Sequence, residues 1–289
     1  MKTNSLYRRA CILLAALVLA ALPFTAFAGT NGRATVDSSD AGEGVVRVNY
    51  EGVSSKKLKV RITYGTDVYN YDLNARGVAE TFPLQLGSGV YKIGVYQNVS
   101  GNSYSLVYSE SVDAKLSSEK APFLRANQKV NFDSSTEVVR VAKKLCEDLE
   151  TDVEMIDAIY AYVIDNYSYD YAKAKQAIAG NLAGYTPDLD EIYRTKKGIC
   201  YDYASMLAAM LRSVGIPAKL VMGYVAPDGI YHAWNEVFIE GEGWVVKQVH
   251  FSGEEWKLMD PTFASAASNS TKINKFIGTG SNYSTKYFY

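Results

Sequence analysis

The composition of this chain of 289 residues argues against a metal site and against a nucleic-acid-binding site. It has only two histidines and three cysteines, scattered without the spacing of zinc ligands. Lysine and arginine form no basic run, and 30 basic residues against 31 acidic ones leave a net charge of −1. We therefore expect no resident cofactor or metal and no nucleic-acid partner.

The one marked apolar run lies at the N-terminus and is typical of a secretory signal. Three basic residues precede a run from 11 to 22, and Ala26-Phe27-Ala28 supplies small residues for cleavage. The run is too short for a comfortable membrane span, and no later segment is apolar enough to be one. We expect residues 1–28 to be a signal peptide and the remainder to be secreted or extracellular, with no transmembrane anchor. Association with the cell surface stays open.

Proline is scarce, with seven residues, whereas tyrosine occurs 23 times. This composition favours ordered structure with half-buried aromatic surface over a linker-rich chain. About 260 residues remain after the predicted cleavage, enough for two domains. We expect an N-terminal domain over 29–115, a linker over 116–134 and a second domain over 135–289.

The N-terminal domain has the pattern of a small antiparallel β-sandwich. Alternating apolar residues predict strands, and glycine-containing turns separate them. The expected strands are 45–50, 58–64, 68–71, 79–86, 90–96 and 103–112. The domain has no histidine, no cysteine and no acidic cluster with ligand spacing. A spacer or docking module is therefore favoured over a catalytic one.

The second domain opens with helices and continues with strands, a pattern typical of an α+β fold. Two hydroxyl-to-glutamate spacings, at 134–137 and at 151–154, predict capping boxes that open helices over about 135–149 and 152–166. A short helix is expected near 189–195. Strands are expected over 218–225, 231–239, 244–251 and 256–260.

The stretch 198–204 and the helix after it organise this domain. Apolar residues predict a largely buried helix over 201–214, ended by Gly215 and Pro217. Cys200 therefore falls at the helix N-terminus, just after Gly198-Ile199, where a glycine lets the backbone turn sharply. The positive end of the helix favours a thiolate, the form that attacks carbonyl carbon.

Cys146 and Cys200 are the cysteines left after cleavage, and a disulfide between them is one alternative in an exported protein. Cys146 lies in a helical pattern and is more simply a small core residue. We favour two free thiols, of which Cys200 is the reactive one.

A reactive thiol needs a base and an orienting acceptor. His232 near the start of a strand and Asp260 at the end of a later strand suit these roles. A lone histidine on a strand is more often structural, and an acid at a strand end more often serves a turn. The interpretation as a catalytic triad therefore rests on Cys200, His232 and Asp260 occurring together in this order.

Five motifs in this order resemble the transglutaminase-like superfamily over about residues 135–265. They are Gly198-Ile199-Cys200-Tyr201-Asp202-Tyr203-Ala204, Gly215-Ile216-Pro217-Ala218, Gly223-Tyr224, Tyr231-His232-Ala233-Trp234-Asn235-Glu236-Val237 and Trp256-Lys257-Leu258-Met259-Asp260-Pro261-Thr262. The resemblance implies a papain-like core with helices packed on an antiparallel sheet. It also implies a triad in which Cys200 is the nucleophile, His232 the base and later acid, and Asp260 the orienting carboxylate.

The chain departs from this resemblance in two ways. The extra hairpin over 244–251 lengthens the interval between His232 and Asp260, and His250 within it matches no motif. The side-chain donor to the oxyanion is not evident. Tyr167 and Tyr169 are candidates for it, although core packing is the commoner role of tyrosine, and Trp234 is a candidate for the substrate cleft.

The implied reaction is acyl transfer from a protein or peptide amide, either crosslinking to an amine or hydrolysis by water. An extracellular or cell-wall protein or peptide is the expected substrate. The alternative is a non-catalytic surface, adhesion or binding protein that docks through its β-sandwich. Calcium dependence and oligomeric state stay open, although no acidic loop has calcium-ligand spacing.

Overall fold

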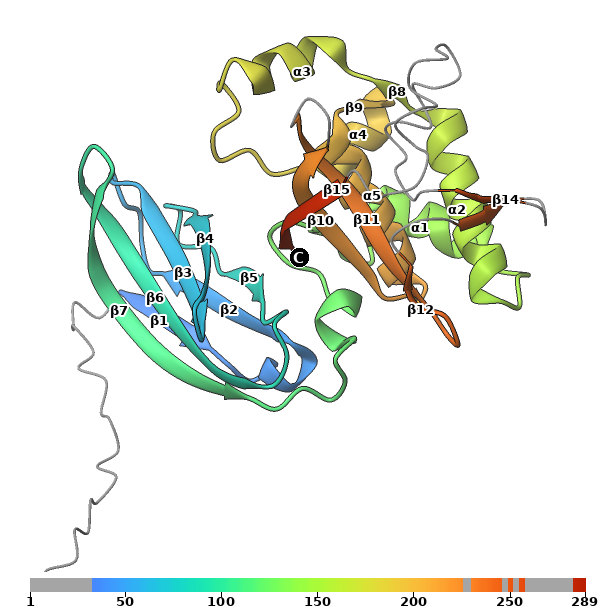
Figure 1. The fold of residues 1–289 in the computed structure, drawn as a ribbon. Coiled ribbons are helices and arrows are strands. Elements are labelled where there is room, and N and C mark those ends of the chain that lie inside the picture. The colour runs from blue at the N-terminus through green and yellow to red at the C-terminus, as the bar shows by residue number, and fades with distance from the viewer. Residues whose placement is uncertain (1–32, 226–229, 246–248, 252–254, 258–282) are drawn as a thin grey trace, which may run out of the picture.

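The computed structural model describes residues 33–225, 230–245, 249–251, 255–257 and 283–289 (Figure 1). The predicted signal peptide lies outside these residues. Among the helices of the described part, none is long and apolar enough to cross a membrane.

The N-terminal part is a β-sandwich of two antiparallel sheets. One sheet has the order β1-β2-β5 and the other the order β4-β3-β6-β7. Their apolar faces share a core in which the rings of Tyr71 and Phe82 meet at 5.0 Å. The strands are β1 (Ala34–Asp37), β2 (Val45–Tyr50), β3 (Leu58–Tyr64), β4 (Asp67–Leu73), β5 (Glu80–Pro83), β6 (Gly89–Ser100) and β7 (Ser103–Ala114). The six predicted strands are confirmed, and β1 was not predicted.

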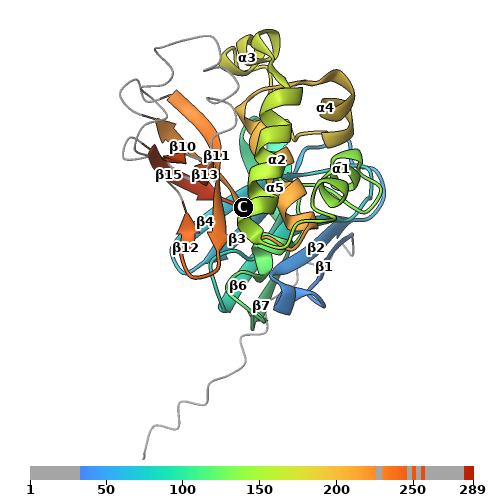
Figure 2. The same cartoon turned by 90° about the vertical axis from the view of Figure 1, so that its right-hand side faces the viewer.

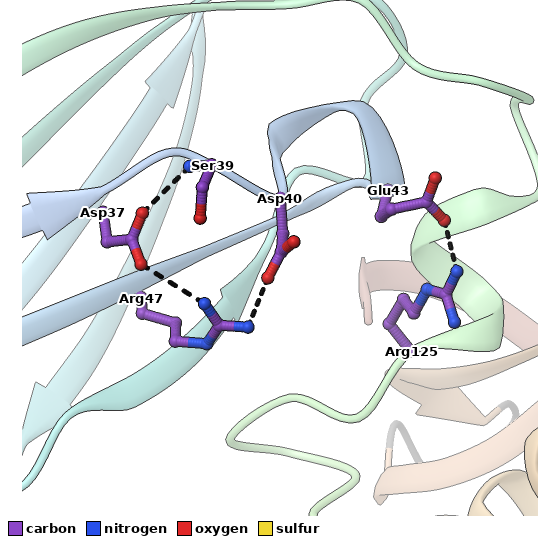
Figure 3. Close-up of polar contacts among 6 residues, drawn as sticks. All are labelled: Asp37, Ser39, Asp40, Glu43, Arg47 and Arg125. Carbon is purple, nitrogen blue, oxygen red and sulfur yellow. Dashed lines mark hydrogen bonds and ion pairs between the residues drawn. The ribbon is translucent and has the colours of Figure 1, made fainter.

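Two short 3₁₀ helices, η1 (Ala41–Glu43) and η2 (Ala121–Leu124), lie where the sandwich meets the second part of the chain. Arg47 pairs with Asp37 and Asp40 on the sandwich, and Arg125 just after η2 pairs with Glu43 (Figure 3). These pairs are largely exposed, so each contributes little to stability. Arg125 matters more through its backbone, because its carbonyl oxygen accepts a hydrogen bond of 2.6 Å from the buried Arg212.

Five α-helices follow in the part of the chain that the structure describes. They are α1 (Glu137–Leu145), α2 (Asp152–Asn166), α3 (Tyr171–Ile178), α4 (Leu189–Thr195) and α5 (Cys200–Ser213). The capping box of α2 is confirmed, since Thr151 and Glu154 bond each other's backbone N–H groups. The box predicted for α1 is wrong. The hydroxyl of Thr136 accepts from the Asp133 N–H, and Asp190 of α4 caps α1 by accepting from the Glu137 N–H at 2.9 Å.

The second part contains an antiparallel sheet with the order β12-β11-β10-β15, and α5 packs against β10 and β11 (Figure 2). The strand predicted over 244–251 is wrong as one element, because β12 pairs with β11 whereas β13 pairs with β14 in a separate sheet. β15 was not predicted. The bounds are β10 (Ala218–Val225), β11 (Ile230–Ile239), β12 (Gly243–Val245), β13 (Val249–Phe251), β14 (Glu255–Lys257) and β15 (Tyr283–Phe288).

The end of the described chain lies between the two parts (Figure 1). The ring of Tyr289 contacts Tyr69 and Tyr71 of β4 at 5.8 and 5.9 Å. Its backbone oxygen accepts from Arg212 of α5 at 2.7 Å, and its N–H donates to Leu220 of β10 at 2.8 Å. The architecture is therefore α+β, a papain-like arrangement of helices on an antiparallel sheet preceded by a β-sandwich, as predicted.

Candidate active site

Cys200 is the first residue of α5 and is partly exposed, whereas nearly all of the helix behind it is buried. Two short strands, β8 (Ser168–Tyr169) and β9 (Lys197–Gly198), pair in parallel just before it and hold the approach to the helix. The first-turn N–H groups of a helix lack intrahelical partners and its dipole is positive there, so this position favours an anion. The predicted placement of the cysteine is confirmed.

Gly198 is required because Asp202 packs directly against it, not because the backbone makes an unusual turn there. Its φ is not in the left-handed region, so the turn expected of this glycine is not the reason for it. A β-carbon at Gly198 would lie 2.7 Å from Asp202 Cβ, closer than side chains tolerate. The glycine therefore lets Asp202 fold back under the start of α5.

Asp202 is fully buried and binds three donors from different segments. Its carboxylate accepts from the Ile199 N–H at 2.8 Å, from Lys173 Nζ of α3 at 2.6 Å and from the Tyr185 hydroxyl at 2.6 Å. Burial and the charge of Asp202 raise the pKa of Tyr185, which keeps that hydroxyl a donor. The sequence motif contains Asp202, but no local pattern points to its partners.

His232 lies on β11, buried, at the same end of the molecule as Cys200. β11 and α5 run in the same direction, because Asn235 Nδ2 donates to Ala204 O at 2.9 Å and Phe238 N donates to Pro217 O beyond the helix end. His232 precedes Asn235 by three residues, and Cys200 precedes Ala204 by one helical turn. The two predicted site residues are thus at corresponding ends of neighbouring elements.

Tyr231 gives a second indication of this proximity. Burial is the main cause that raises the pKa of Tyr231 to about 12, and nearby tyrosines and the charge of Cys200 contribute. The strand residue next to His232 is therefore within electrostatic reach of the thiol. Gly223 opposite His232 lets β15 approach closely, since a β-carbon there would meet Ser284 O at 2.0 Å.

The structure separates the two tyrosines that were candidates for the oxyanion donor. Tyr169 on β8 pairs with Gly198, two residues before Cys200. Tyr167 is buried beside Tyr162, with Lys196 Nζ 4.7 Å from its ring. Trp234 is fully buried on β11, and its ring meets Tyr283 of β15 at 4.8 Å. Of the two tyrosines, Tyr169 thus has the position that better suits an oxyanion donor.

Asp260 lies outside the described residues, and so does the side chain of His250, whose backbone belongs to β13. Both Cys146 and Cys200 are free thiols, so the alternative of a disulfide between them is not realised. Cys146 caps α1, is 7% exposed, and has the pKa of its thiol raised by burial. The described residues contain no group of histidine, cysteine and acidic side chains that suits a metal ion.

Comparison with known sequences gives several matches. An uncharacterized protein of Bacillus subtilis, YebA, is 24% identical over 221 residues, covering 65% of this chain. The human kyphoscoliosis peptidase is 28% identical over 42% of this chain. A protein-glutamine gamma-glutamyltransferase of Pseudomonas aeruginosa is 28% identical over 36% of it.

These proteins are longer, and the alignments cover only 30%, 17% and 17% of their respective lengths. The family model described as the transglutaminase-like superfamily matches residues 139–249, which run from α1 to the start of β13 and include both Cys200 and His232. Over residues 139–249 the chain is therefore transglutaminase-like.

Proposed function

We propose that this chain is a cysteine-dependent acyl-transfer enzyme that acts on amide groups of proteins or peptides. The observation that carries the proposal is the position of Cys200 at the start of a buried helix, with His232 at the same end of the adjacent strand. A thiol there has the helix terminus to favour its anionic form and an imidazole to share its proton.

In the proposed reaction, the Cys200 thiolate attacks the amide carbonyl carbon and forms a tetrahedral oxyanion. The Cys200 N–H is a candidate donor to this oxygen, with Tyr169 as the side-chain candidate. As the carbon–nitrogen bond breaks, protonated His232 gives its proton to the leaving amine, and a thioester remains. Asp260 is the proposed acceptor that fixes the imidazole tautomer.

The thioester then has two fates. Attack by an amine, with His232 taking its proton, forms a new amide and regenerates the thiol. Attack by water releases the acid instead. The names of the two characterised relatives represent both outcomes, a peptidase and a glutamyltransferase, so both belong to the proposal.

We place this activity outside the cell, on the basis of the signal-like residues 1–28, with an extracellular or cell-wall protein as substrate. A second candidate function is docking through the sandwich. It has one specific observation in its favour, a pocket of about 260 Å³ on the outer face of the sheet containing β3 and β6. Its lining residues are Lys59, Arg61, Asn70, Tyr96, Asn102 and Tyr104.

The first test is the pH dependence of alkylation, with each adduct mapped by mass spectrometry. We expect iodoacetamide to label Cys200 well below the midpoint of a free thiol, about pH 8.5, and to label Cys146 slowly at every pH. His232→Ala is expected to slow labelling of Cys200 about tenfold or more near neutral pH, whereas the matched variant His250→Ala leaves it unchanged. Equal reactivity of the two cysteines would overturn the proposal.

The second test separates the two fates of the acyl-enzyme. A glutamine-containing peptide donor is incubated with and without a labelled primary amine, using Cys200→Ala as the blank. Amine incorporation identifies a transferase, and release of acid or a shortened peptide in either condition identifies a hydrolase. Wild-type rates no higher than those of Cys200→Ala across a panel of peptide donors would favour docking as the function.

A further inference from the structure

We propose that Lys173 and Asp202 are positioning residues that hold the start of α5 and set the pH range in which Cys200 reacts. This inference rests on the proposed function of Cys200. It gives a role to two charged residues that lie outside the predicted triad. Asp202 stands in the motif around Cys200, where no role was predicted for it, and Lys173 stands in none of the motifs.

The pair is unusually well enclosed for a salt bridge. The Asp202 side chain is fully buried and that of Lys173 is 21% exposed, with 2.6 Å between Nζ and Oδ2. Lys173 Nζ also lies 4.1 Å from the centre of the Tyr185 ring and donates to its hydroxyl at 2.5 Å. Removing one member of such a pair leaves an uncompensated charge, which costs more than breaking an exposed pair.

The pair acts on Cys200 through the backbone. Asp202 Oδ2 accepts both from Lys173 and from the N–H of Ile199, the residue that precedes the nucleophile. The Asp170 N–H in turn donates to Gly198 O at 2.9 Å, and the Asp170 side chain caps α3 by accepting from the Lys173 N–H. The segment before Cys200 is thus held from both sides by the pair and the cap of α3.

α3 itself has no buried residue, so side-chain burial does little to hold it in place. The described bonds that join it to α5 and β9 are those of Lys173 and of its cap residue Asp170. The geometry of the nucleophile therefore depends on polar contacts more than on packing at this point.

The charges have opposite effects on a thiolate. The carboxylate of Asp202 lies two residues from Cys200 at the same positive helix end, so by itself it disfavours a second anion there. The ammonium of Lys173 offsets this repulsion. Other titratable groups facing this region, among the described residues, are Asp170 before α3, Tyr185 and Asp188 from the loop before α4, Tyr201 on α5, Tyr231 and His232 from β11, and Tyr289.

This arrangement predicts shifts of opposite sign in the pH midpoint of Cys200 alkylation. Lys173→Met should raise the midpoint and slow labelling at pH 6.5 by about tenfold, because the carboxylate is then uncompensated. Asp202→Asn should lower the midpoint, because the ammonium remains. Lys173→Arg should stay close to wild type, and the double variant Lys173→Met/Asp202→Asn should fall between the two single variants.

Thermal unfolding and the labelling of buried Cys146 serve as controls for loss of structure. Midpoints that stay equal, or that move in the same direction for both single variants while Cys146 stays protected, would overturn the inference. If one single variant unfolds, the other is compared with the double variant, which restores the local charge balance. Equal midpoints in these two variants would overturn the inference. If Cys200 of the wild-type protein is not labelled below the pH midpoint of a free thiol, the proposed function itself fails. That outcome is distinct from a failure of this inference, which concerns only the variants.

Discussion

At the scale of single residues, the start of α5 depends on very close contacts. Gly198 and Asp202 approach so closely that a methyl group on the glycine would meet Asp202 Cβ at 2.7 Å. The carboxylate can then reach the Ile199 N–H and Lys173 Nζ together. One missing side chain thus allows the polar contacts that place the nucleophile.

We predict that Gly198→Ala weakens Cys200 labelling and lowers stability by about 1–3 kcal/mol, the usual cost of overpacking. Alkylation kinetics and urea unfolding measure the two effects. Gly42→Ala is the matched control, because a β-carbon there would meet its nearest neighbour, Lys115 O, at an ordinary 3.5 Å. Wild-type behaviour of Gly198→Ala in both measurements would show that the contact has no influence on the site.

At the scale of elements, the helices begin by two different means. α2 is capped within its own sequence by Thr151 and Glu154, with the glutamate accepting from the Thr151 N–H at 3.1 Å. α1 is capped by Asp190, 53 residues away along the chain. The start of α2 is therefore a property of a local segment, whereas the Glu137 N–H at the start of α1 finds its acceptor only when α4 has docked.

We predict that Thr151→Ala costs about 1 kcal/mol of stability, the usual value for loss of an N-cap. The pH dependence has a defined sign. Hydrogen bonds from Thr151 lower the pKa of Glu154, so the stabilisation from the ionised carboxylate is present above its unfolded pKa and is lost as the pH falls through the folded one. Urea titrations at pH 7 and pH 3 should show the gap between wild type and Glu154→Gln closing in acid. A gap of equal size at both pH values would contradict this.

At the scale of the whole molecule, the end of the described chain joins the two parts. Tyr289 packs on Tyr69 and Tyr71 of the sandwich and also accepts a hydrogen bond from Arg212 of α5. Arg212 is buried on α5 and donates to backbone oxygens of Ala218, Arg125 and Tyr289. Burial lowers the pKa of Arg212 to about 9, which leaves it charged at neutral pH. The hydroxyl of Tyr201 is buried here and has no hydrogen-bond partner among the described residues.

We predict a loss of stability in alkali. Burial is the main cause that raises the pKa of Tyr71 and of Tyr201 well above the usual value, and it raises that of Tyr231 to about 12. The folded state thus favours the protonated phenols. Their contribution is complete below the unfolded pKa of about 10 and is lost as the pH rises through the folded values.

Absorbance at 295 nm and circular dichroism, followed together, measure this effect. A group of tyrosines should ionise only as the fold is lost, and Tyr71→Phe should lessen the alkaline loss while keeping stability at pH 7. Full ionisation near pH 10 with unchanged circular dichroism would contradict the prediction.

The features that could be predicted from the amino-acid pattern are local in origin. The alternation over 58–64 and 218–225 predicts β3 and β10 residue for residue, and the spacing of Thr151 and Glu154 predicts the start of α2. The apolar stripe after Gly198 predicts α5 and the place of Cys200. Such patterns succeed because side-chain periodicity and helix caps act within one or two turns of the chain.

Features whose partners lie far apart in the chain arise only on folding. β15 is a strand because β10 offers it an edge, and Asp202 is a buried acid because α3 brings Lys173 to it across 29 residues. The cap of α1 and the three acceptors of Arg212 likewise come from other segments. These contacts were invisible in the sequence because a hydrogen bond or a strand edge places no demand on the residues next to it in the chain.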